Sequence, residues 1–169
     1  MAMEYIIWLV FAVLIVAAII LIAGKKGTSK EYDERQRLLR GQAYQHAFLT
    51  LLVYCVLYGT LSFVTERHFM EDGAAVFIGA FLGLAVFAVE CVWRDAFFAI
   101  SRTPRSYLIL YAVVTAVELI NTVIRIRNGS LIRDGLLTVD CVYPAMGLTF
   151  LSILVAVVLR RLTGKEAED

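Results

Sequence analysis

Four side chains that can carry charge or coordinate an ion interrupt two neighbouring apolar stretches of this chain. Glu118, Asn121 and Arg125 are spaced three and four residues apart, which places them on one face of a helix. Asp140 lies in the next apolar stretch, at a depth comparable with Arg125 if the two stretches form a helical hairpin. A charge at the centre of a membrane-spanning helix costs about 2.5–3.5 kcal/mol on insertion scales, so these residues are candidates for function.

Pro144 makes Asp140 a stronger candidate. A proline four residues after Asp140 cannot donate to the carbonyl of residue 140, so we expect the helix to kink and leave that oxygen free. A carboxylate beside a free carbonyl, facing Glu118 and Asn121, is typical of a proton or small-cation site. The competing explanation needs no ligand: Asp140 pairs with Arg125, and protonated Glu118 hydrogen-bonds Asn121. The residue types leave both explanations open.

A second polar cluster is predicted where two apolar stretches meet the interface. His46 lies near the start of one stretch, and Glu90, Arg94 and Asp95 lie at the end of the next. A histidine beside a carboxylate can sense pH or pass protons. The alternative is a histidine that only completes a local hydrogen-bond network.

The chain carries no motif of a known catalytic site. It has no GxSxG, HExxH or CxxC sequence and no glycine-rich phosphate loop. Its cysteines, Cys55, Cys91 and Cys141, lie in three separate apolar stretches, which disfavours a zinc site or a disulfide scaffold. We therefore expect a non-enzymatic protein that binds no cofactor, metal or nucleic acid.

The elements that hold these residues are membrane helices. Hydrophobic residues make up 60% of the chain, charged residues 18%, and the mean hydropathy is +0.77, which excludes an ordinary soluble domain. The charges cluster between apolar runs. These runs predict an all-α bundle of five transmembrane helices, in a single membrane domain over residues 1–169, at about 5–23, 43–64, 73–93, 106–124 and 135–159.

The first of these runs is uncharged and spans about 28 Å as a helix, close to the thickness of a bilayer core. Glu4 precedes it, and Lys25 and Lys26 follow it. A cleaved signal peptide would need a basic start and a shorter apolar region, so we expect a retained helix.

A juxtamembrane interfacial helix is predicted over residues 28–42, between the first two runs. Thr28 followed by Glu31 fits a capping box. Its charged residues are candidates for contact with a protein partner or with anionic lipid: Asp33, Glu34, Arg35, Arg37 and Arg40. Because Asp33 and Glu34 interrupt the basic residues, we favour a protein partner at the cytoplasmic face.

The positive-inside rule predicts the amino terminus outside and the carboxyl terminus inside. With that orientation the cytoplasmic segments contain Lys25, Lys26, Lys30, Arg35, Arg37, Arg40, Arg94, Arg102, Arg105, Arg160, Arg161 and Lys165. The outer segments contain only Arg67, Arg125, Arg127 and Arg133.

The third run carries small residues at intervals of four, namely Ala75, Gly79 and Gly83. Small residues on one face allow two helix backbones to approach closely, so this face should be a packing seam. The partner is either another helix of the chain or, through Gly79 and Gly83, a second copy in a homo-oligomer.

Two stretches carry a resemblance to a known group of proteins. They are Asp33-Glu34-Arg35-Gln36 with the following Arg40-Gly41-Gln42-Ala43-Tyr44-Gln45, and Trp93-Arg94-Asp95-Ala96-Phe97-Phe98. On these residues the chain resembles small, uncharacterised polytopic membrane proteins of Firmicutes with a juxtamembrane Asp-Glu-Arg-Gln motif. The resemblance implies a multi-pass protein of a bacterial cytoplasmic membrane, sometimes found with small DNA-binding regulators, and implies no activity.

Two functions remain from the sequence. The first is an accessory or regulatory membrane protein that acts through a cytoplasmic or membrane partner. The alternative is a small oligomeric transporter or channel built around the intramembrane acidic residues.

Overall fold

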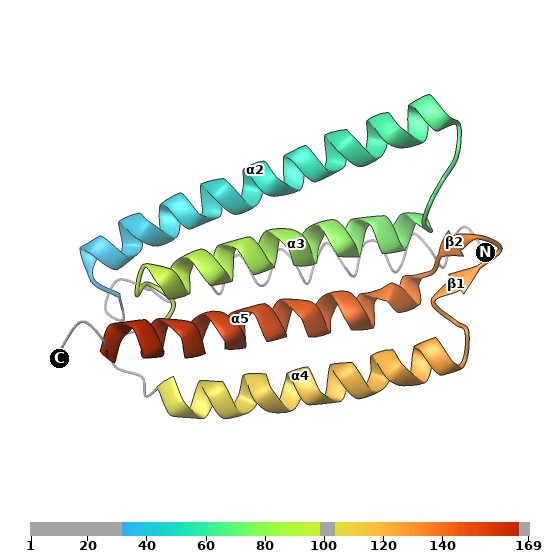
Figure 1. The fold of residues 1–169 in the computed structure, drawn as a ribbon. Helices are drawn as coiled ribbons and strands as arrows, with labels where there is room; N and C mark the ends of the chain where they lie inside the picture. Colours follow the sequence, from blue (N-terminus) through green and yellow to red (C-terminus); the bar gives the residue numbers. More distant parts are fainter. Residues whose placement is uncertain (1–31, 99–103, 166–169) are drawn as a thin grey trace, which may run out of the picture. The chain divides into compact units, whose positions relative to one another are not determined.

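The computed structural model describes residues 32–98 and 104–165, so the predicted first span at 5–23 and the capping box at 28–31 lie outside it. Four helices make up most of the described chain (Figure 1): α2 (Glu34–Thr65), α3 (Asp72–Trp93), α4 (Pro104–Arg127) and α5 (Val142–Lys165). Each contains a stretch long and apolar enough to cross a membrane. The prediction of a helical chain built from membrane-length elements is confirmed for these residues.

Helix α2 is one continuous helix of 32 residues. The interfacial helix predicted to end at residue 42 and the span predicted to start at residue 43 are therefore parts of one unbroken helix from residue 34. No proline interrupts this stretch, and Gly41 costs only about 1 kcal/mol of helix propensity. The helix is about 48 Å long, against about 30 Å for a bilayer core. The helix is therefore longer than a perpendicular crossing of such a core requires.

The helices pack in the order α2, α3, α5, α4, which Figure 1 shows side by side. Helix α3 contacts α2 on one side and α5 on the other, and α4 packs along α5. An apolar core of Ala88, Val92, Ile153, Ala156 and Val157 joins α3 to α5. Helix α5 therefore lies between α3 and α4, although α4 precedes it in the sequence.

A short β-hairpin connects α4 to α5. Strands β1 (Ile132–Arg133) and β2 (Leu136–Leu137) are antiparallel, with Arg133 paired to Leu136. Asp134 and Gly135, the turn residues, both have positive φ, of 51° and 79°. Positive φ at both central residues is the conformation of a type I′ turn, which Asp-Gly favours.

The fifth predicted span therefore starts too early, because Gly135 lies in this turn. The helical segment begins with the 3-10 helix η2 (Val139–Cys141), and α5 follows directly. Pro144 is the third residue of α5, where the helix has only just started. The predicted kink inside the span is thus wrong, since a proline is tolerated in the first turn of a helix.

The hairpin also ties the two halves of the described chain together. Leu137 N–H donates to Phe69 O at 3.1 Å, and Glu71 N–H donates to Leu137 O at 2.8 Å. A carboxylate oxygen of Glu71 accepts from Val139 N–H at 2.9 Å, where an acidic group favours a helix start. We call this the hairpin end, and the opposite end, where α2 starts and α3 ends, the motif end.

The small-residue seam on α3 faces α2. A Cβ atom added at Gly79 would lie 2.7 Å from the Tyr54 ring, and one added at Gly83 would lie 3.4 Å from Ala47 O. The seam is therefore internal to the chain. The face predicted as an alternative contact for a second copy is covered by α2.

Candidate functional site

The two stretches that carry the family resemblance pack against each other at the motif end. Gln36 Nε2 donates to the carbonyl oxygens of Asp95, at 2.8 Å, and Phe98, at 3.4 Å. Arg40 Nη1 donates to Ala96 O at 3.2 Å. Ala43 and Ala96 are both fully buried in this contact region. We call this set of α2-to-loop hydrogen bonds the clamp.

The clamp provides hydrogen-bond donors to backbone carbonyl groups that follow the end of α3. Asp95 has a φ of 56°, its N–H donates to Val92 O, and Ala96 N–H donates to Cys91 O. This is the Schellman pattern that ends a helix, in which the chain turns sharply away. The carbonyls after the turn have no helical partner, so Gln36 and Arg40 supply donors for them.

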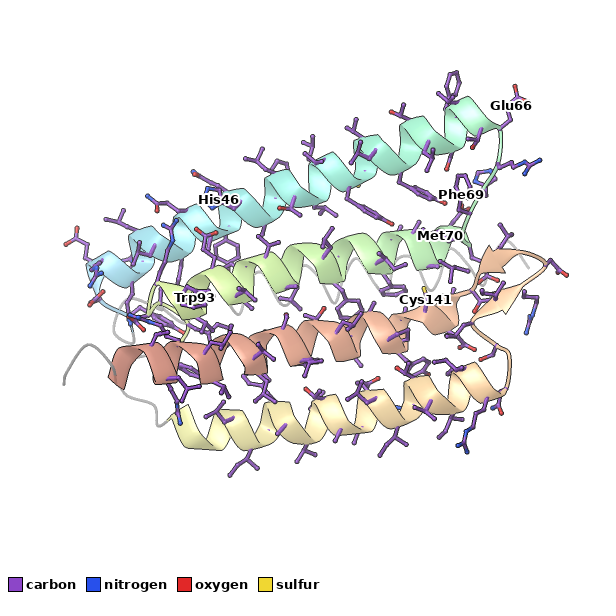
Figure 2. All side chains as sticks on the ribbon, viewed as in Figure 1. His46, Glu66, Phe69, Met70, Trp93 and Cys141 are labelled. Atoms are coloured by element: carbon purple, nitrogen blue, oxygen red, sulfur yellow. The ribbon has the colours of Figure 1, made fainter. Side chains whose placement is uncertain are left out.

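The predicted polar cluster at this end is assembled from α2 and α3. His46 Nδ1 lies 2.7 Å from a Glu90 carboxylate oxygen, and the other Glu90 oxygen lies 2.8 Å from Arg94 Nη2. Arg94 also donates to Gln42 Oε1. Figure 2 shows His46 and Trp93 toward the motif end, with Met70 and Cys141 at the other. His46, Glu90 and Arg94 therefore form one connected network.

Asp95, the fourth predicted member, points to a different helix. Its carboxylate pairs with Arg160 of α5, with Oδ2 at 2.6 Å from Nη2 and Oδ1 at 3.3 Å from Nε. The pair lies beside an apolar pocket of about 250 Å³ lined by Phe97, Phe98 and neighbouring residues. Asp95 thus links the end of α3 to the end of α5.

The predicted partner-contact residues divide into two groups. Arg40 is partly buried and belongs to the clamp. Glu34, Arg35 and Arg37 are exposed on the projecting first turns of α2, next to Leu38, whose side chain is 67% exposed. Asp33 is also exposed and precedes the first residue of α2.

At the hairpin end, Arg125 and Asp140 form an ion pair through one guanidinium nitrogen. Arg125 Nη1 lies 3.0 Å from both carboxylate oxygens of Asp140. Arg125 Nη2 donates to Tyr143 Oη at 3.2 Å, and the guanidinium carbon lies 4.6 Å from the centre of the Tyr143 ring. This is the ion pair predicted as the ligand-free alternative. Both carboxylate oxygens of Asp140 are therefore engaged by Arg125.

Glu118 has a buried carboxylate oxygen without a polar partner among the described residues. It is buried between α4 and α5, with 7% of its surface exposed. Its Oε2 is inaccessible and has no hydrogen-bond partner in the described chain. The Cα of Gly147 on α5 approaches so closely that a Cβ added there would lie 3.3 Å from Glu118 Cβ. The predicted hydrogen bond from Glu118 to Asn121 is not formed.

The structure does not bring Glu118 and Asp140 into one site. Arg125 follows Glu118 by seven residues on α4, about 10 Å along the helix, and Asp140 lies in η2, seven residues before Gly147. The predicted four-residue site is therefore two sites at different depths. Among the described residues, no three His, Cys, Asp or Glu side chains gather at metal-binding distance.

Comparison with protein-family models, with curated proteins and with solved structures finds no match to this chain. The site is therefore interpreted from its geometry alone.

Several residues that form these polar contacts were not predicted from the sequence. Gln36 and Gln42 were part of the quoted motif, but nothing in their type indicated that they would reach the α3–α4 connection. The contact of Tyr143 could have been predicted, because it follows Asp140 by three residues and so shares its helix face.

Proposed function

We propose that this chain is a non-enzymatic, multi-pass protein of a bacterial cytoplasmic membrane that acts through a protein partner at its motif end. The observation that supports this is the projecting start of α2. Glu34, Arg35, Arg37 and Leu38 are exposed there on a helix that is longer than a bilayer core is thick. On this proposal the chain belongs to the Firmicutes group that it resembles.

The proposed topology has five transmembrane helices, with the amino terminus outside and the motif end in the cytoplasm. The basic residues support this orientation, since Arg35, Arg37, Arg160 and Arg161 lie at the motif end. A reporter enzyme fused after Asp169 should be active only as a cytoplasmic fusion. A periplasmic reporter at that position would overturn the orientation.

The clamp supports a recognition role because it orders the projecting helix before any partner binds. Gln36 and Arg40 hold this part of α2 against the α3–α4 connection. The side chains between these two residues therefore point away from α2 in fixed directions, which lowers the entropic cost of binding a partner.

The mixed charge favours a protein over lipid alone. A basic residue near an anionic membrane surface contributes about 1 kcal/mol of attraction. Glu34 is exposed beside Arg35 and would weaken that attraction. A protein surface with complementary charges of both signs can use all of these side chains, and Leu38 adds an apolar contact.

The test is co-purification from the native membrane after chemical cross-linking. We expect a variant with Glu34→Arg, Arg35→Glu and Arg37→Glu to lose a protein that the unchanged chain retains. Reversing Arg133 and Asp134, which are exposed in the hairpin, is the matched control and should leave that protein bound. An identical set of co-purifying proteins in both variants would rule out the proposed surface.

A small oligomeric transporter or channel is the second candidate, and Glu118 is the observation that favours it. A buried carboxyl group without a partner is expensive in a membrane helix and is often functional. The pairing of Asp140 with Arg125 weighs against a multidentate cation site. Ion flux in proteoliposomes that is lost in Glu118→Gln would favour this candidate over the partner role.

A further inference from the structure

The carboxyl group of Glu118 has few polar groups around it. Its Oε2 is covered by protein atoms, and Gly147, which packs against the Glu118 Cβ, has no polar side chain to offer. The nearest hydroxyl groups on its own helix belong to Thr115 and Thr122, both of which donate to helix carbonyls. A metal ion would need several oxygen ligands, whereas a proton needs only the carboxylate.

The contact gives the buried carboxylate oxygen of Glu118 no hydrogen-bond partner among the described residues. Moving an unpaired charge out of water costs several kcal/mol even after relaxation. The charged or titratable groups that face this contact are few. On α4 they are Arg125 and Tyr111, each about two turns away; near the hairpin end they are Asp140 in η2 and Tyr143 at the start of α5.

Arg125 does not neutralise Glu118, because both of its terminal nitrogens are engaged. Nη1 contacts the two oxygens of Asp140, and Nη2 contacts Tyr143. Helix α3 packs on α5 rather than along α4, so its acidic and basic residues lie at the two ends of the bundle and not beside Glu118.

The two directions away from Glu118 differ in polarity. Toward the motif end, Tyr111 stacks on Phe150 with ring centres 5.8 Å apart, and both pack on the apolar core around Ile153. Toward the hairpin end, Asn121 and Thr122 are partly exposed and lead to the pair of Arg125 and Asp140. The polar side chains next to Glu118 therefore lie toward the hairpin end, and the apolar core lies toward the motif end.

We propose that Glu118 is a proton-binding site in the α4–α5 contact, and that it exchanges its proton with water at the hairpin end past Asn121 and Thr122. The closed contact holds the neutral acid. Loss of the proton leaves a buried carboxylate without a partner in this contact, which favours separation of α4 from α5. The site is independent of the partner surface on α2, so either proposal can fail alone.

Dicyclohexylcarbodiimide tests this proposal, because it enters membranes and reacts with protonated carboxyl groups. The acid adds across one C=N bond: the carboxyl oxygen bonds to carbon and the proton moves to nitrogen. The adduct rearranges to an N-acylurea of the same composition, which mass spectrometry locates in the chain. Right-side-out and inverted membrane vesicles allow the pH to be set separately at each end of the bundle.

We expect Glu118 to be labelled at acidic pH, and Glu90, which is paired with His46 and Arg94, to be labelled far less. Raising the pH at the hairpin end should reduce labelling of Glu118, by about tenfold per pH unit once most of the acid is ionised. The pH at the motif end should have no effect. A Glu118 that stays unlabelled under acidic conditions on both sides, or one that follows the pH at the motif end, would overturn the proposal.

A pair of matched variants tests the route. Thr122→Val and Thr115→Val each remove a hydroxyl one helical turn from Glu118, on opposite sides, and each hydroxyl donates to a carbonyl of its own helix. We expect Thr122→Val to slow the response of labelling to a pH jump several-fold, with Thr115→Val unchanged. Equal responses would exclude the proposed path, and thermal unfolding verifies that both variants fold.

Discussion

Substitution of Gly79 by alanine tests the seam between α2 and α3 directly. The new Cβ would lie 2.7 Å from two atoms of the Tyr54 ring and 3.1 Å from a methyl group of Leu51. Carbon atoms prefer separations of about 3.5–4.0 Å, so the ring must move by about 1 Å. Tyr54 Oη now donates to Ala75 O at 2.8 Å, and that hydrogen bond would be weakened by the movement.

Three contributions determine the expected change in the free energy of unfolding. Overpacking a well-packed contact costs about 1–3 kcal/mol, and a weakened hydrogen bond costs about 1 kcal/mol. Replacing glycine by alanine in a helix returns about 1 kcal/mol. We therefore expect Gly79→Ala to lower the free energy of unfolding by about 1–3 kcal/mol.

Gly59 is the matched control, because it lies in α2 with no atom within 4 Å of an added Cβ. We expect Gly59→Ala to raise the free energy of unfolding by up to about 1 kcal/mol. The assay is unfolding of the purified protein in mixed detergent micelles, followed by circular dichroism. If Gly79→Ala were as stable as Gly59→Ala, α2 could not occupy this face of α3.

Two further predictions concern the polar contacts at the ends of the bundle. Arg125→Gln should lower the free energy of unfolding by about 1–2 kcal/mol. Adding Asp140→Asn should recover part of that loss, because no carboxylate is then left unpaired. A double-mutant cycle measures this coupling, and additive effects of the two substitutions would contradict the pairing. Arg40→Met should speed hydrogen exchange or proteolysis at the α3–α4 connection by loosening the clamp, whereas Arg37→Met, at an exposed position, should leave both unchanged.

The spans between residues 34 and 165 could be predicted because a bilayer imposes a length on each apolar run. The bounds of α3, Asp72–Trp93, differ by a single residue from the prediction, since polar residues flank both ends. The start of α5 could not be found from hydropathy, because Leu136, Leu137 and Val139 are apolar although they precede the helix. The Asp-Gly pair at the hairpin turn was the local signal that would have corrected it.

The candidate site shows the same division between local and long-range information. Helical spacing predicts that Glu118 and Arg125 share a face of α4, which needs only the helix period. Whether Asp140 reaches Glu118 or Arg125 depends on how far α5 is displaced along α4. That displacement is set by the hairpin and η2, which the sequence reasoning placed inside the span. The clamp joins residues about sixty positions apart, and no periodic pattern encodes such a contact.

The central position of α5 has a consequence for the order in which this protein is made. Helices α2 and α3 leave the ribosome together and can pair at once through the glycine seam. Helix α4 is made next, but its packing partner is α5, which follows only after the hairpin. During that interval Glu118 and Arg125 lack the helix that covers them. In a membrane, α4 would therefore expose both side chains until α5 is made and packs against it.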